Sequence, residues 1–231
     1  MNALDGASKN LSTFTIDTRT GFNFRVAAGS KSHTGESVDY EHTPARQWFV
    51  LRVLYGRADA AHDLLESKEV CWYQPLRIEV KKVKDKKRFR RTYFFPGLIF
   101  AYIEPKDLDE LIKNKRDNTV LSYYYNHFAI NAEGKNPPLT IPCPVMDNFI
   151  RLTSVEDEHI RVVDPNACRY KRGDMVIITE GKFKGIVGRL ARVMQEQRVV
   201  INLEGVGMVA TAYIPTGVIA PFKEWEKGIK P

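Results

Sequence analysis

The sequence changes its pattern once, near residue 155, and this change limits the fold more than any other feature. Between residues 47 and 154, runs of β-branched and aromatic residues alternate with segments of helical period. Between residues 170 and 222, short strand-like runs are broken by glycine or proline, without a helical period. Residues 155–169 are charged and show no sustained period. A chain of 231 residues is long enough for two small domains, so the sequence predicts two modules joined by a linker.

The first module is predicted to be an α+β sandwich, in which helices pack on an antiparallel sheet. Its elements are expected in the order strand, helix, strand, strand, helix, strand, helix. The third strand is the longest, and we expect it to bend where Pro96 removes a hydrogen-bond donor and Gly97 relaxes the backbone. The expected segments are, in that order, residues 46–56, 57–70, 71–83, 88–103, 105–117, 120–131 and 137–154.

The second module is predicted to be a small closed β-barrel. Short strands within residues 170–222 would leave exposed edges in an open sheet, and closure removes those edges. The tail that follows it comprises residues 223–231. The expected breaks between the strands lie at Gly173, Gly181, Gly185, Gly205 and Pro215.

Residues 1–46 are predicted to be a flexible arm. They are rich in Ser, Thr, Gly, Asn and charged residues, so they cannot bury enough apolar surface to offset the entropy of ordering. A small hairpin is the alternative for residues 12–26, because apolar residues alternate with polar ones on both sides of a Thr-Gly pair. A hairpin of this kind would need a surface to dock on.

The positive charge of the chain is concentrated in one segment. Residues 77–91 contain nine Lys and Arg residues and two acids, a local net charge of +7 that equals the net charge of the whole chain. A field focused in this way attracts a polyanion or an acidic protein surface, whereas the alternative is a hairpin that is merely solvated. The candidate nucleic-acid-binding residues are Lys81, Lys82, Lys84, Lys86, Lys87, Arg88, Arg90 and Arg91.

Several functional classes are disfavoured by the residue patterns. Cys71, Cys143 and Cys168 form no CxxC pair, which fits a reducing cytoplasm and neither a disulfide framework nor a zinc site. The five histidines form no HExxH or HxxxH pattern, so we expect no metal and no cofactor. The sequence contains no Walker loop and no nucleophile elbow, so we expect no enzyme. The apolar runs are far shorter than the ~20 residues that cross a bilayer, so we expect no membrane partner.

The second module carries the most specific motif of the chain. The stretch RGDMVIITEGKFKGIVGRLARV, residues 172–193, has a polar Gly-Asp turn, an alternating strand, a glycine-bounded tip and a returning strand. It resembles the KOW motif, and this resemblance implies an SH3-like barrel. The motif residues are Gly173, Asp174, Gly181, Phe183 and Gly185.

The first module is similar to the N-terminal (NGN) domain of the NusG family. The stretches QWFVLRVLYG, YQPLRIEV and YFFPGLIFAYI are similar to the opening strand, the start of the hairpin and the FFPGY-type strand of that domain. The two resemblances together cover residues 47–222, in the order that the family shows. The long N-terminal arm and the short first helix are more similar to specialised paralogues of the UpxY or RfaH type than to the housekeeping factor.

The resemblance implies a transcription elongation and antitermination factor that acts as a monomer. Its NGN domain would bind the clamp helices of RNA polymerase, bridge the clamp across the DNA channel and suppress pausing or termination. An aromatic patch suits such a contact, and we expect Phe95 to point outward because strand alternation puts Phe94 on the other face. The alternative is that both phenylalanines are buried. The implied polymerase-binding residues are Trp48, Phe49, Phe94, Phe95, Pro96 and Gly97.

The resemblance also implies further partners and leaves one other function open. The basic hairpin would face the upstream DNA or the non-template strand. In the stretch NLEG, Glu204 stands where the housekeeping factor has an aromatic residue, so recruitment of Rho or a ribosomal protein is not expected. The alternative is an RNA- or ribosome-binding KOW protein, in which Tyr123 and Tyr125 would stack on bases.

Overall fold

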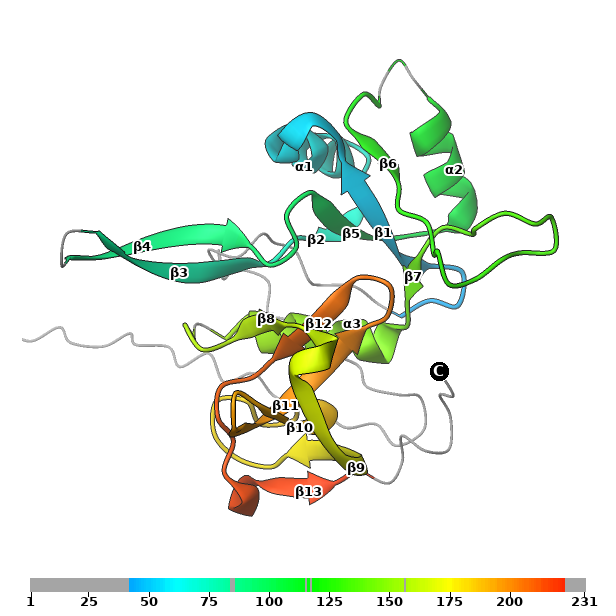
Figure 1. Ribbon diagram of the computed structural model, residues 1–231. Coiled ribbons are helices and arrows are strands. Elements are labelled where there is room, and N and C mark those ends of the chain that lie inside the picture. The colour runs from blue at the N-terminus through cyan, green and yellow to red at the C-terminus, as the bar shows by residue number, and fades with distance from the viewer. Residues whose placement is uncertain (1–41, 84–85, 115, 117, 156, 223–231) are drawn as a thin grey trace, which may run out of the picture.

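The structure, a computed structural model, divides into an N-terminal α+β part and a C-terminal sheet (Figure 1). Residues 1–41, which hold most of the predicted arm and the segment 12–26, lie outside the described residues, as do Lys84 and the tail 223–231, so the predictions for them are not tested. No helix in the described part of the chain combines the length and hydrophobicity that crossing a membrane requires. The described residues are 42–83, 86–114, 116, 118–155 and 157–222.

The N-terminal part is built on an antiparallel sheet of the order β2-β5-β1-β6, in which β7 also pairs with β1. A separate two-stranded hairpin, β3–β4, projects from this sheet (Figure 1). The strands of the sheet are β1 (Gln47–Val53), β2 (Cys71–Tyr73), β5 (Leu98–Ile103), β6 (Leu121–Tyr123) and β7 (Thr140–Ile141). The hairpin strands are β3 (Leu76–Val83) and β4 (Lys86–Tyr93), and the helices are α1 (Ala58–Ser67), α2 (Pro105–Lys113) and α3 (Cys143–Thr153).

The two faces of this sheet are covered by different elements. Along β1, Phe49 and Leu51 belong to a core cluster with α1 and α2, whereas Trp48 and Val50 belong to a second cluster with α3. This division follows from the two-residue period of a strand, which points successive side chains to opposite faces. Helix α2 has Asp107 in its first turn and Lys113 in its last, so these charges oppose the helix dipole at both ends.

The predicted long strand over residues 88–103 is wrong: it is two strands separated by a turn. Strand β4 ends at Tyr93 and β5 begins at Leu98, so residues 94–97 form a turn, which we call the FFPG turn. Pro96 cannot donate to a strand ladder, and Gly97 adopts a left-handed φ of 78°. Both residues were expected to bend one strand, but they lie in a turn after β4, which pairs with β3, and before β5, which pairs with β1 and β2.

The predicted strand over residues 120–131 is also shorter than expected. Strand β6 ends at Tyr123, and a long connection, which we call the β6–β7 loop (residues 124–139), precedes β7. Within this loop, Asn126 donates its backbone N–H to the carbonyl of Pro137 at 2.8 Å. The apolar residues of this segment therefore lie in a folded loop and not along a strand.

The C-terminal sheet has six antiparallel strands in the order β13-β9-β10-β11-β12-β8. The prediction of a closed barrel is not confirmed, because β13 and β8 stand at opposite ends of this order and do not pair in the described residues. Closure depends on stagger between strands, which counting short strands cannot supply. The strands are β8 (Arg161–Val163), β9 (Cys168–Ile178), β10 (Val187–Val193), β11 (Glu196–Leu203), β12 (Gly207–Ala210) and β13 (Ile219–Pro221).

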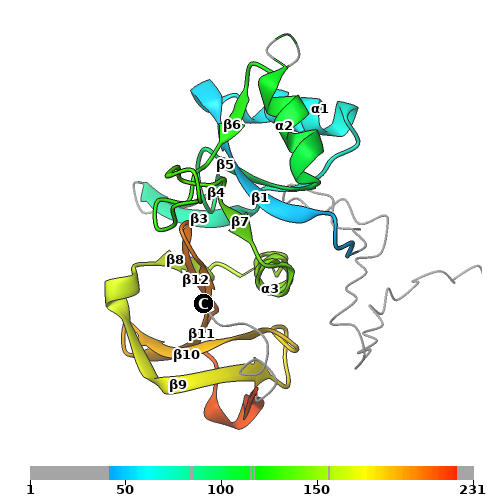
Figure 2. The same ribbon diagram turned by 90° about the vertical axis from the view of Figure 1, so that its right-hand side faces the viewer.

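Helix α3 lies between the two sheets and joins their cores (Figure 2). One continuous cluster of buried residues contains Phe100 from β5, Phe149 from α3 and Ile201 from β11. Short 3-10 turns complete the fold at Leu54–Gly56, Pro165–Ala167 and Thr216–Val218. The N-terminal part and the C-terminal sheet therefore bury apolar surface against each other.

Candidate functional site

Both phenylalanines of the FFPG turn face the same side of the N-terminal sheet. Phe94 is 5% exposed and lies within the cluster that contains α3, and Phe95 is partly buried against the same cluster. The Phe95 ring lies 6.5 Å from Phe100 and 6.0 Å from Phe149, measured between ring centroids. The expectation that strand alternation separates the two residues is wrong, because residues 94–97 are a turn and the two-residue period does not apply there.

The other residues predicted for this patch are divided between the two faces. Trp48 is fully buried on the α3 side of the sheet, whereas Phe49 is buried on the side of α1 and α2. Pro96 is exposed, and Gly97 accepts a hydrogen bond from the backbone N–H of Val53 at 2.8 Å. The structure thus brings Trp48, Phe94 and Phe95 to one face and leaves Phe49 on the other.

The C-terminal sheet covers the FFPG turn through the connection between β11 and β12. A Cβ atom added to Gly207 would lie 2.9 Å from the Phe95 ring, and one added to Gly205 would lie 3.0 Å from Leu139. Both positions therefore lack room for a side chain unless the neighbour moves. Gly205 also has a left-handed φ of 79°, which disfavours most other residues there.

Two polar contacts fasten α3 to the C-terminal sheet. Arg151 donates from Nη1 to the carbonyl of Gly185 at 2.6 Å, and the backbone N–H of Val187 donates to Oδ1 of Asn148 at 2.7 Å. Arg151 is half-buried, and this burial lowers the pKa of its guanidinium. A helix over residues 137–154 was predicted from the sequence, but these two residues were missed, although their spacing of three puts them on one side of a helix.

The predicted KOW motif residues have different environments. Phe183 is buried in the shared core, and Gly181 and Gly185 have left-handed φ values of 78° and 83°. Gly173 and Asp174 lie within β9, where a turn was predicted. The β9–β10 ladder shifts register between Arg189 and Ala191, so the extra residues form an irregularity within the strand.

The basic segment forms the two-stranded hairpin that was predicted. The backbone register puts Lys81 opposite Arg88 and Lys82 opposite Lys87, and Arg90 is exposed. Nearer the sheet, Arg77 pairs with Glu79 at 2.5 Å, so charge is partly neutralised at the base of the hairpin. Figure 1 shows the hairpin projecting away from both sheets.

The tyrosines proposed for base stacking are partly used within the domain. The Tyr123 hydroxyl donates to Asp109 on α2, and burial together with this contact raises its pKa. The Tyr125 ring lies 5.8 Å from that of Tyr123 and is 44% exposed. Arg52 lies 5.7 Å above the ring of Tyr124 on the other face. This region therefore offers a half-exposed aromatic edge and no open stack of rings.

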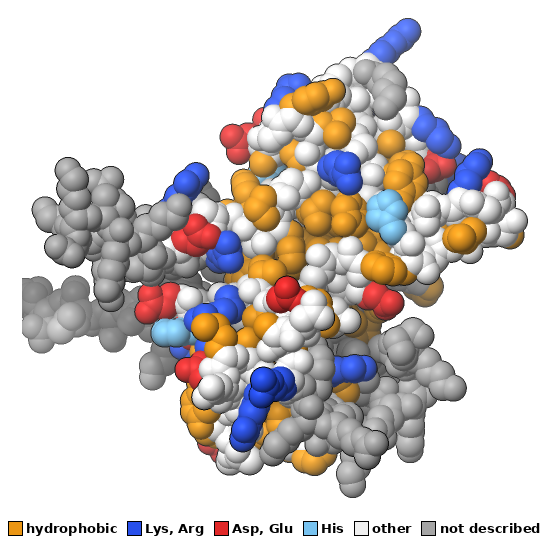
Figure 3. All heavy atoms as spheres, in the orientation of Figure 1, with side chains coloured by type: hydrophobic (Ala, Val, Ile, Leu, Met, Phe, Trp, Pro, Cys, Tyr) orange, Lys and Arg blue, Asp and Glu red, His pale blue; other side chains and the backbone are white. Residues whose placement is uncertain are grey.

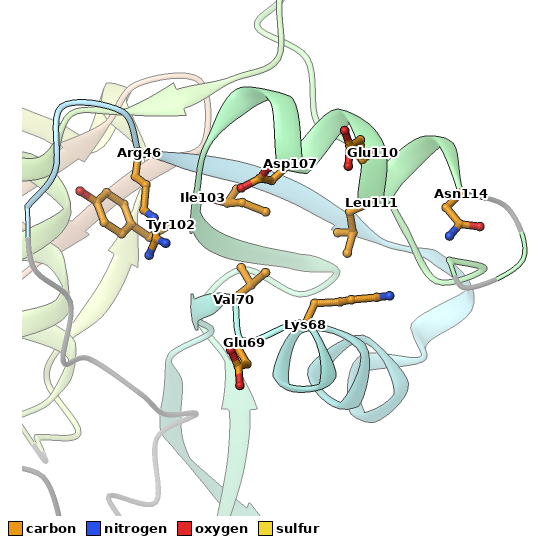
Figure 4. A pocket seen from close by; sticks show the side chains of 10 residues that line it. All are labelled: Arg46, Lys68, Glu69, Val70, Tyr102, Ile103, Asp107, Glu110, Leu111 and Asn114. Atoms are coloured by element: carbon orange, nitrogen blue, oxygen red, sulfur yellow. The ribbon is translucent and has the colours of Figure 1, made fainter.

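A cavity of about 330 Å³ lies between α2 and the connection from α1 to β2 (Figure 4). Asp107 and Glu110 line it from α2, and Lys68 and Glu69 line it from the opposite side. Because side chains of both charges line it, the cavity focuses no strong field on a charged ligand. Across the described residues, no group of three His, Cys, Asp or Glu side chains is placed to hold a metal ion.

The fold defines an α+β module whose aromatic face packs against α3 and the C-terminal sheet. Residues 46–150 match the family model described as transcription termination factor nusG. This match supports a NusG family member, and factors of this family act in transcription. A search of curated proteins found no match. The family match ends within α3, so the KOW resemblance of residues 170–222 and the specialisation of the UpxY or RfaH type stay predictions.

Proposed function

We propose that the chain is a transcription elongation and antitermination factor that binds the clamp helices of RNA polymerase through residues 47–154. The observation that carries this proposal is the aromatic cluster at the FFPG turn, which lies on one face of the sheet inside the family match. Aromatic side chains bury a large area at a low cost in entropy, so they suit the tip of a coiled coil. Bridging the clamp across the DNA channel would favour the elongating state over the paused state.

The same cluster supports a condition on this binding. Phe95 is half-buried and packs beneath Gly207, so a clamp helix can cover the whole Phe95 ring only after the C-terminal sheet has moved away. We infer that the described arrangement is a closed form and that polymerase binds an open form. The affinity of polymerase is then reduced by the fraction of molecules that are open, and opening the chain raises the apparent affinity.

The β3–β4 hairpin supports a second contact, with the upstream DNA or the non-template strand. It carries the excess positive charge of the chain and projects away from the face that the C-terminal sheet covers (Figure 1). Each phosphate contact would release counterions, which makes the affinity for the transcription complex depend on salt.

The test uses one substitution that opens the chain and one matched control. In Gly205→Asp the added Cβ atom would lie 3.0 Å from a methyl group of Leu139, so the side chain fits only if Leu139 or the C-terminal sheet shifts. Gly181→Asp introduces the same residue at nearly the same φ of 78°, but no heavy atom lies within 4 Å of the added Cβ. Asp tolerates a left-handed φ better than most residues, so the backbone strain of the two variants is similar.

Binding to core RNA polymerase without RNA is measured for both variants and for the intact chain. We expect Gly205→Asp to bind about tenfold or more tightly than Gly181→Asp, which should match the intact chain. Adding Phe95→Ala to Gly205→Asp should weaken binding by about thirtyfold, the effect of losing one aromatic anchor. Absence of polymerase binding by all forms would reject this function. The RNA- or ribosome-binding alternative would then predict that the intact chain binds RNA.

A further inference from the structure

The β6–β7 loop exposes two large apolar side chains that no part of the described chain covers. Phe128 is 82% exposed and Ile130 is 76% exposed, and neither belongs to a core cluster. The surface view shows hydrophobic side chains on this projecting loop, at the right of the molecule (Figure 3). Single exposed apolar residues are common, but here two lie two positions apart in one loop. Exposure of these side chains to water is unfavourable, and burial against another surface would remove this free-energy cost.

The loop is held in a defined conformation by asparagine side chains. Asn136 donates from Nδ2 to the carbonyls of Asn126 and Ala129, both at 2.9 Å. Asn126 in turn accepts the backbone N–H of Phe128 at its Oδ1, also at 2.9 Å. These bonds fix the backbone on both sides of Phe128 and just before Ile130.

A second set of bonds closes the tip of the loop. Oδ1 of Asn131 accepts the backbone N–H groups of Glu133 at 3.0 Å and Lys135 at 2.9 Å. Asn131 also donates its own backbone N–H to the carbonyl of Lys135 at 2.8 Å. A loop that is already ordered loses little conformational entropy on binding, so apolar side chains displayed on it contribute more of their burial to affinity.

The charge of the loop argues for a protein partner. Residues 126–137 carry one Glu and one Lys, which pair with each other at 3.6 Å, and one His. Nucleic acid binding depends on positive charge that neutralises phosphates, and this loop supplies no excess. Two apolar side chains on a neutral loop fit an apolar pocket on the surface of another protein.

The position of the loop indicates which protein carries that pocket. At its root, Tyr124 packs against the same core cluster as Phe95 and donates its backbone N–H to the carbonyl of Val50 at 3.3 Å. The loop therefore leaves the sheet at the edge of the face that contains the FFPG turn. Figure 1 shows it extending to the side opposite the β3–β4 hairpin, and the C-terminal sheet does not cover it.

We propose that Phe128 and Ile130 form a second anchor, which inserts into an apolar pocket of RNA polymerase next to the surface that receives the FFPG turn. This inference rests on the proposed function. Because the two side chains are exposed while Phe95 is covered, the second anchor makes the first contact with polymerase in the closed form. The contact then holds the chain in place while the C-terminal sheet moves away from the FFPG turn.

The test is the double variant Phe128→Ser/Ile130→Ser in the full chain, with Met194→Ser/Tyr213→Ser as the control. The control removes two side chains that are 72% and 56% exposed but lie in the C-terminal part of the chain. Both variants should keep the melting temperature of the intact chain, because the changed side chains are exposed. Binding to core polymerase should weaken about thirtyfold for the loop variant and stay unchanged for the control.

A third variant separates the apolar contact from the order of the loop. Asn136→Ala keeps Phe128 and Ile130 but removes two bonds that hold the loop. It should accelerate amide exchange within residues 126–137 and weaken binding less than the double variant does.

The outcomes distinguish this inference from the proposed function. If the Phe128→Ser/Ile130→Ser variant binds polymerase as tightly as the intact chain while Phe95→Ala weakens the opened chain, the second anchor is wrong and the proposed function stands. If no form binds polymerase, both are wrong. If the intact chain forms a dimer in light scattering and the loop variant does not, a second copy of the chain is the partner, and the inference is overturned.

Discussion

The contact between Arg151 and Gly185 allows a quantitative prediction about the closed form. Replacing Arg151 with Met retains an apolar stem but removes the guanidinium that donates to the Gly185 carbonyl at 2.6 Å. A hydrogen bond from a charged group contributes about 1.5–3 kcal/mol net. Burial lowers the pKa of Arg151, so the buried charge itself has a cost, and the lower end of this range applies. The variant should therefore shift the equilibrium between closed and open forms by about tenfold.

The backbone amide of Val187 measures this equilibrium directly. Its N–H donates to Asn148 on α3, so the bond breaks when the C-terminal sheet leaves α3. Hydrogen exchange of this amide, followed by NMR, should be about tenfold faster in Arg151→Met than in the intact chain. The control is Arg189→Met, which changes an exposed arginine on the same strand, β10. If the Val187 amide exchanges at the same rate in both variants, this prediction is wrong. It is also wrong if Arg151→Met accelerates the exchange of all core amides equally, because that result indicates global destabilisation.

Two further predictions concern charge. Replacing Lys86, Lys87 and Arg88 with Glu should make the affinity for the DNA-containing transcription complex less dependent on salt. The slope of log affinity against log salt concentration should fall by about 0.7–0.9 for each phosphate that the hairpin no longer neutralises. An unchanged slope would show that the hairpin does not contact the nucleic acid. Burial raises the pKa of Asp157, but hydrogen bonds from Lys182 and His159 outweigh this effect, so the pKa of Asp157 in the folded state is lowered. The ionised carboxylate therefore stabilises the fold at a pH above its ordinary pKa of about 3.9. This stabilisation is lost as the pH falls through the folded-state pKa. The melting temperature of Asp157→Asn should therefore vary less with pH than that of the intact chain between about pH 5 and 2, and parallel curves would contradict this.

Periodicity in the sequence predicts which segments of the N-terminal part are helices and strands. The helical period within residues 105–117 predicts α2, and the stripe that produces this period, Leu108, Leu111 and Ile112, is buried against the sheet. The α+β alternation and the three predicted helices are confirmed, since each element must place one apolar face on a shared core. The predicted order of strands is not, because the segments 71–83 and 88–103 each form two strands and β7 (Thr140–Ile141) lies within the segment predicted as a helix. Periodicity does not predict where a strand ends at a turn, which is why the FFPG turn and the end of β6 were missed.

Contacts between distant segments could not be predicted in this way. The predicted aromatic patch was assigned from one strand at a time, but the burial of Phe95 is decided by Gly207 and Phe149, which lie on β12 and α3. Asn148 and Arg151 were missed because their partners are backbone groups of β10 and the turn before it. The sequence shows only that residue 185 is a glycine, and the structure gives a reason for it, since a Cβ atom there would lie 2.7 Å from Nη1 of Arg151.

The central claim is that this chain acts on RNA polymerase during elongation and that its closed form limits this action. A single-round elongation assay on a template with strong pauses tests it most directly, with the intact chain, Gly205→Asp and Gly181→Asp added at equal concentrations below saturation. The account predicts shorter pauses with Gly205→Asp than with Gly181→Asp, which should act like the intact chain. Pause lifetimes that no form changes, even at saturating concentration, would contradict the account.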